Sequence, residues 1–157
     1  MPQLARNFAA HLLAMIALFV ALSAAGVAAA DRPAIYSASG KLAVKGADVV
    51  AYFTERRAVI GKAAYSTTWR GATWRFSSAE NLAKFKADPA KYAPQYGGYC
   101  AYAVSEGYTA KIEPEAWSIV DGKLYLNYSL GVRSLWKRNK QERIRKANTN
   151  WPGVLKR

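Results

Sequence analysis

The chain has 157 residues, and its 23 Lys and Arg outnumber its 10 Asp and Glu, which gives a formal net charge of +13 at pH 7. Its single cysteine, Cys100, excludes an internal disulfide. This length supports one hydrophobic core and is too short for two.

The first thirty residues have the three parts of a secretory signal peptide. Arg6 is their only charged side chain, a largely apolar run extends over residues 12–27, and small residues end at Ala30. We therefore expect cleavage near Ala30 and a periplasmic or secreted protein of residues 31–157. The alternative is an uncleaved anchor, since a spanning helix needs about 20 apolar residues. Cleavage removes His11, the only histidine, so we expect no catalytic site and a non-enzymatic protein.

In chain order, a first hairpin and a helix follow a buried apolar run at residues 49–53. Residues 64–70 and 73–76 are rich in strand formers and flank a tight Gly71-Ala72 connection. Ser77 with Glu80 has the spacing of a capping box, which predicts a helix start, and Asp88-Pro89 predicts its end.

A second hairpin and a terminal helix complete the predicted fold. Residues 116–120 and 123–128 flank Asp121-Gly122, a pair that favours a tight hairpin turn. A long basic helix is expected over about residues 131–147, ending before Trp151-Pro152. The predicted class is α+β, a small single domain with two β-hairpins, a short helix and a long C-terminal helix.

The segment after the first hairpin ends in Phe85-x-x-Asp88-Pro89-x-x-Tyr92, and with its flanks at about residues 44–102 it resembles the YHS domain family. The flanking sequence is similar to that of exported, bacterial members of the family. The resemblance implies a binding module that handles metal, with copper as the implied cofactor.

This sequence departs from the family at the positions of its thiols. The family cysteines fall on Ala51, Ser77 and Asn81. A soft metal such as Cu(I) selects thiolates, so only Cys100 and Asp48 are left as candidate metal ligands. Cys100 has a second interpretation as a small buried hydrophobic residue, and Asp48 has one as a backbone cap.

Two further groups of residues are candidates for binding. Tyr52, Tyr96, Tyr99 and Tyr102 could line a small-molecule pocket, or they could simply pack as aromatic core. On the terminal helix, Lys137, Arg138 and Lys140 could contact an anionic surface weakly, or form a solvated face. The helix has no interleaved aromatic residues, so no specific nucleic acid partner is expected.

The sequence thus supports two functional hypotheses. The first is an exported YHS module that binds or handles a metal ion, with copper implied, through Cys100 and Asp48. The second is a small-molecule-binding or protein-interaction adaptor domain that keeps the scaffold and has lost the metal site. The oligomeric state is left open.

Overall fold

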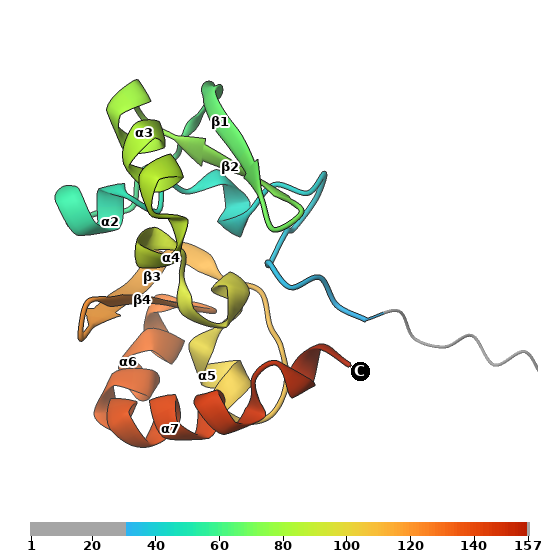
Figure 1. The fold of residues 1–157 in the computed structure, drawn as a ribbon. Helices are drawn as coiled ribbons and strands as arrows, with labels where there is room; N and C mark the ends of the chain where they lie inside the picture. Colours follow the sequence, from blue (N-terminus) through green and yellow to red (C-terminus); the bar gives the residue numbers. More distant parts are fainter. Residues whose placement is uncertain (1–30, 157) are drawn as a thin grey trace, which may run out of the picture. The chain divides into compact units, whose positions relative to one another are not determined.

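Two antiparallel hairpins organise the structure, a computed structural model that describes residues 31–156 (Figure 1). The signal peptide predicted over residues 1–30 lies outside the described residues. No helix in residues 31–156 combines the length and the apolar character needed to cross a membrane.

The first hairpin packs against the helix that follows it in the chain. Strand β1 (Lys62–Trp69) pairs with β2 (Ala72–Phe76) through a turn at Arg70 and Gly71, which have φ of 49° and 75°. Such a turn matches the twist of the flanking strands, and glycine adopts positive φ without steric cost. The predicted Gly71-Ala72 connection was wrong by one residue, because Ala72 already pairs with Trp69. Helix α3 (Ala79–Ala87) packs its buried Phe85 against this hairpin, with ring centroids 5.0 Å from Phe76.

The second hairpin carries the C-terminal helices. Strands β3 (Glu113–Val120) and β4 (Lys123–Asn127) join at Asp121 and Gly122, again with positive φ. In Figure 1, α5 (Ala101–Ser105), α6 (Leu130–Arg138) and α7 (Lys140–Asn150) gather beside this hairpin. The predicted α+β class, the two hairpins and the first helix are confirmed.

The terminal helix differs from the prediction because it is divided in two. Asn139 has φ −132° and ψ 44°, outside the helical region, and separates α6 from α7. Asparagine favours such positions because its side chain competes for backbone hydrogen bonds. The break lets the two helices cover different surfaces, since α6 packs on β3 and β4 while α7 packs on α5.

The start of α3 also differs from the prediction. The capping side chain is Ser78, whose Oγ accepts a hydrogen bond from the backbone N–H of Asn81 at 3.1 Å. Ser77 was the wrong residue for this role, because its hydroxyl is already used in a buried contact with Asp48.

Five further short helical segments lie outside these elements, and the apolar side chains bury in two clusters. The first cluster joins the first hairpin and α3 to Leu124 and Leu126 of the second hairpin. The second cluster lies under α6 and α7 and includes Tyr96, Trp136 and Ala147. The short segments are η1 (Val44–Gly46), α2 (Ala51–Thr54), α4 (Pro89–Tyr92), η2 (Gln95–Gly98) and η3 (Gly153–Leu155).

Gly61, directly before β1, lies in close contact with the backbone of β2. A Cβ at Gly61 would lie 2.4 Å from the carbonyl carbon of Arg75, whereas one at Gly153 would meet nothing within 4 Å. We expect Gly61→Ala to lower the free energy of unfolding by about 2–3 kcal/mol, because backbone must move to make room. Gly153→Ala should stay within about 0.5 kcal/mol of the parent. Urea titration measures both, and equal effects would contradict the packing described.

Candidate functional site

The carboxylate of Asp48 is buried at the centre of the region where the family thiols would fall. Its Oδ1 accepts hydrogen bonds from the backbone N–H of Val50 and Ala51 at 2.9 and 3.2 Å. Its Oδ2 accepts from the N–H and the hydroxyl of Ser77 at 2.8 and 2.7 Å, and from Asn81 Nδ2 at 2.8 Å. The side chain is 0 % exposed, and no ion pair reaches it from residues 31–156.

These five hydrogen bonds use the acceptor capacity of the Asp48 carboxylate. An ionised carboxylate offers about four lone-pair sites. The donors belong to Val50 and to Ala51, Ser77 and Asn81, the positions onto which the sequence resemblance places the family cysteines. The arrangement therefore supports the capping interpretation of Asp48, and no thiolate is present there to bind a soft metal.

Cys100 lies in a separate and enclosed position before α5. Its side chain is 1 % exposed, and its Sγ lies 3.8 Å from Oδ1 of the buried Asn127. Burial raises the pKa of the Cys100 thiol, and the nearby N–H groups of Ala103, Tyr128 and Tyr102 only partly oppose that effect. A protonated, enclosed thiol is a poor nucleophile and a poor metal ligand.

The structure does not bring Cys100 and Asp48 into one ligand set. They share no hydrogen-bond partner, because Cys100 faces Asn127 while Asp48 faces the start of α2 and α3. Among residues 31–156, no group of three or more His, Cys, Asp or Glu side chains could hold a metal ion. The residues present therefore do not fit a copper centre.

The four predicted pocket tyrosines lie in different places. Tyr52 is buried in the first cluster and donates to the carbonyl oxygen of Pro114 at 2.9 Å. Tyr96 and Tyr99 belong to the second cluster, and their hydroxyls reach Asn148 Oδ1 and the carbonyl oxygen of Pro33, both at 2.9 Å. Tyr102 lies under Arg143, whose guanidinium carbon is 3.8 Å from the ring centroid. Of the four, only Tyr96 lines the groove that Trp69 and Trp151 also line.

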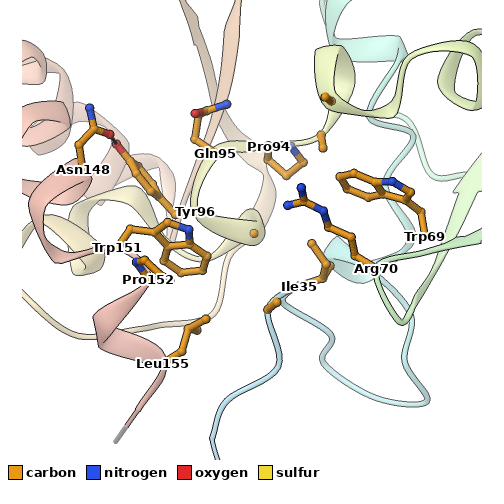
Figure 2. A pocket seen from close by; sticks show the side chains of 14 residues that line it. Ile35, Trp69, Arg70, Pro94, Gln95, Tyr96, Asn148, Trp151, Pro152 and Leu155 are labelled. Atoms are coloured by element: carbon orange, nitrogen blue, oxygen red, sulfur yellow. Dashed lines mark hydrogen bonds between the residues drawn. The ribbon is translucent and has the colours of Figure 1, made fainter.

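That groove has a volume of about 610 Å³ and runs between the tip of the first hairpin and the end of α7. Figure 2 shows Arg70 and Trp69 on one side and Tyr96, Trp151 and Asn148 on the other. The guanidinium carbon of Arg70 lies 4.6 Å from the Trp69 ring centroid, which orients the cation along the groove. No acidic side chain lines it.

The sequence reasoning missed the residues on the hairpin side of the groove. Trp69 and Arg70 lie at the end of the predicted strand over residues 64–70, and their role depends on the approach of the distant segment at residues 148–155. A usable signal was the adjacent tryptophan and arginine beside the predicted hairpin turn, since Trp and Arg are enriched in binding sites.

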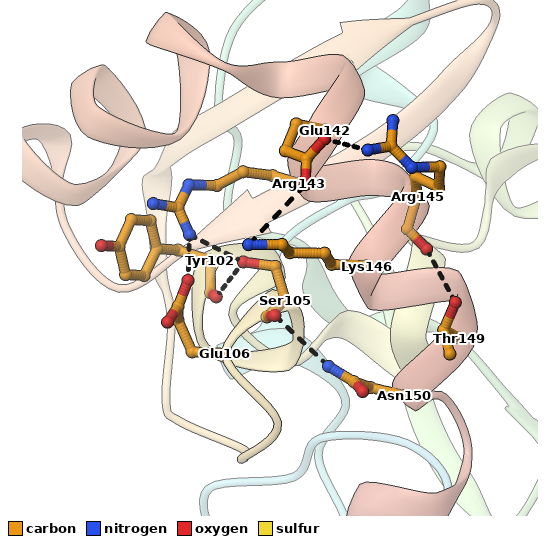
Figure 3. Close-up of polar contacts among 9 residues, drawn as sticks. All are labelled: Tyr102, Ser105, Glu106, Glu142, Arg143, Arg145, Lys146, Thr149 and Asn150. Carbon is orange, nitrogen blue, oxygen red and sulfur yellow. Dashed lines mark hydrogen bonds and ion pairs between the residues drawn. The ribbon is translucent and has the colours of Figure 1, made fainter.

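The basic residues of the terminal helices fall into two groups. Figure 3 shows three basic residues of α7 in contacts: Arg143 pairs with Glu106 and donates to Ser105, while Arg145 and Lys146 pair with Glu142. The predicted anionic-contact residues Lys137, Arg138 and Lys140 are exposed and form no ion pair within residues 31–156. Together with Arg133, they are the cations of α6 and α7 that lack an ion pair in the described part of the chain.

Comparison with known proteins gives one family match. Residues 50–96 match the family model described as the YHS domain. The chain carries a YHS domain. No curated protein and no solved structure matches the chain.

The matched YHS segment contains the first hairpin, α3, α4 and the start of η2. Asp48 lies just before this segment and Cys100 just after it, while Ala51, Ser77 and Asn81 lie inside it. The hydrogen bonds to Asp48 therefore join the start of α2 to the start of α3, both inside the matched segment.

Removal of the Asp48 carboxylate should destabilise the YHS domain strongly. Asp48→Ala leaves two backbone N–H groups and the Ser77 and Asn81 donors without a partner, so we expect a loss of about 3 kcal/mol or more in unfolding free energy. Asp88→Ala is the matched control, because Asp88 caps α4 at the surface. It should cost about 1 kcal/mol. Chemical denaturation compares the two, and similar losses would contradict the buried role.

The thiol of Cys100 should be unreactive in the folded protein at mildly alkaline pH. An exposed thiol has a pKa of about 8.5, whereas burial raises the pKa of Cys100 above its ordinary value. We expect alkylation by iodoacetamide at pH 8.5 to be at least about 100-fold slower in the native protein than in urea. Mass spectrometry measures both rates. Rapid modification of the native protein would show that the thiol is accessible.

Proposed function

We propose that this protein is a non-catalytic, small-molecule-binding YHS domain whose scaffold has exchanged the family metal site for a hydrogen-bonded carboxylate. The groove between Trp69 and Trp151 would hold the ligand. A place outside the cytoplasm is part of the proposal and rests on the leader predicted over residues 1–30.

The observation that carries the proposal is the chemistry of the groove lining. Aromatic surfaces of Trp69 and Trp151 face a space of about 610 Å³, and Arg70 supplies a cation. Pockets of this size suit small organic ligands that combine apolar walls with few polar contacts. The complementary ligand is a flat organic molecule that carries an acidic group, because the guanidinium binds carboxylate or sulfonate oxygens well.

Metal handling through Cys100 and Asp48 is the less supported alternative. Asp48 is saturated by its donors, and the Cys100 thiol is enclosed and protonated at neutral pH. Neither group is free to ligate, and no second soft donor accompanies them in the described residues.

A fluorescent aromatic sulfonate tests the groove. We expect 8-anilinonaphthalene-1-sulfonate to bind the folded protein, and Arg70→Gln to raise its dissociation constant about fivefold through loss of one charged contact. Lys62→Gln, on the same hairpin and outside the groove, is the matched control and should leave the constant unchanged. Titration by fluorescence measures all three. Equal weakening by both variants would mean that the dye reports overall charge, and would overturn the groove assignment.

A separate titration distinguishes loss of the metal site from its retention. Under reducing conditions, the parent protein and Cys100→Ser should bind Cu(I) equally weakly in competition with a chelator. Tight binding by the parent that is lost in Cys100→Ser would restore the metal hypothesis.

A further inference from the structure

A second cavity, of about 590 Å³, lies between the second hairpin and the start of the C-terminal helices. It is lined on one side by strand β3 and on the other by α6 and the first residue of α7. The lining residues are Arg56, Trp117, Ser118, Ile119, Val120, Arg133, Trp136, Lys137 and Lys140.

The charge of this cavity is entirely positive. Four of its lining side chains are cationic, and no acidic side chain lines it. None of these four cations forms an ion pair with a residue in the range 31–156, in contrast to Arg143, Arg145 and Lys146 further along α7. Uncompensated cations that converge on a recess raise the local concentration of anions.

Three residues of the cavity lining have a buried polar atom that lacks a hydrogen-bond partner in the described residues. Within the described residues, Ser118 Oγ, Arg133 Nε and Trp136 Nε1 are buried and accept or donate no hydrogen bond. Trp136 is 0 % exposed and Ser118 is 6 % exposed. Buried polar groups are normally satisfied, so each such group calls for an explanation. The arginine and tryptophan nitrogens are donors only, so the missing partner is an acceptor.

The arginine at this site is held in place by the neighbouring strand. Arg133 Nη1 donates to the carbonyl oxygens of Glu115 and Trp117 at 3.4 and 3.3 Å. These contacts orient the planar guanidinium beside β3 before any ligand binds. A fixed guanidinium binds tetrahedral oxyanions with less loss of conformational entropy than a free one.

We propose that this cavity is a binding site for a small anion that carries a phosphate-type oxyanion. The four cations would neutralise its charge, and the unpartnered donors would face its acceptor oxygens. The cavity is larger than one phosphate, and Ile119 and Val120 add an apolar wall. An organic phosphate or a pyrophosphate group therefore fits better than a lone ion. This site is distinct from the groove at Arg70 and does not depend on it.

Inorganic pyrophosphate is the probe for this site, titrated calorimetrically into the purified protein. We expect saturable binding, and at least about tenfold weaker binding by Lys137→Gln/Lys140→Gln, which removes two of the cations. Lys62→Gln/Lys86→Gln makes the same change in net charge at exposed sites outside the cavity, and should bind as the parent does. No saturable binding by the parent, or equal weakening by both double variants, would overturn the proposal.

Ser118→Ala separates binding from folding. It removes a buried hydroxyl that has no partner in the described residues, so stability should be unchanged or higher while pyrophosphate binding weakens. Unchanged binding by this variant, together with unchanged binding by Lys137→Gln/Lys140→Gln, would place the anion elsewhere and contradict the site.

Vesicles that contain phosphatidylglycerol distinguish a lipid headgroup from a soluble source. Pyrophosphate binding without vesicle retention supports a soluble phosphate ligand. Retention that pyrophosphate displaces supports the same site with a lipid headgroup as its source. Retention that pyrophosphate does not affect, in a protein that fails to bind pyrophosphate, would overturn the proposal in favour of diffuse attraction to the surface.

Discussion

The buried carboxylate of Asp48 is the constraint on which the YHS part of the fold depends. Removal of an ionised group from water costs several kcal/mol, and no cation of the described residues offsets that cost. Instead, Ser77 and Asn81, which are distant from Asp48 in sequence, donate hydrogen bonds to the carboxylate. Because of these bonds, the turn at Asp48, the first hairpin and α3 must assemble together. Helix α2, which follows Asp48, connects this region to the second hairpin, because the Tyr52 hydroxyl donates to the carbonyl oxygen of Pro114 in β3. Burial raises the pKa of Tyr52 and keeps this donor protonated.

Local chemistry made the hairpins and helix α3 predictable, because the glycine turn at Gly71, the Asp121-Gly122 turn and the Asp88-Pro89 stop act over a few residues. The errors came from contacts between distant segments. Ser77 has the sequence pattern of a helix cap, but its hydroxyl donates a hydrogen bond to the carboxylate of Asp48, which is distant in sequence. The tyrosines look like one group in the sequence, but their separation into two clusters depends on how α7 docks.

For the candidate sites too, the sequence indicated single residues, whereas their surroundings depend on contacts between distant segments. Cys100 and Asp48 stand out in the sequence through their chemistry, whereas their burial and their different partners appear only in three dimensions. The cavity beside α6 combines residues 56, 117–120 and 133–140, and no short motif connects these segments. Basic charge in the sequence indicated the region, but only ion pairing separates its compensated residues from its free ones.

The first hydrophobic cluster includes residues from inside and from outside the matched YHS segment. Trp74 and Phe85 come from the segment that the family model covers, but Ile112, Leu124 and Leu126, which complete the same cluster, lie beyond it. A polypeptide cut at the limits of the motif would present these aromatic rings to water and would be prone to aggregate. The segment that the family model matches is thus smaller than the structural unit that shares this hydrophobic cluster.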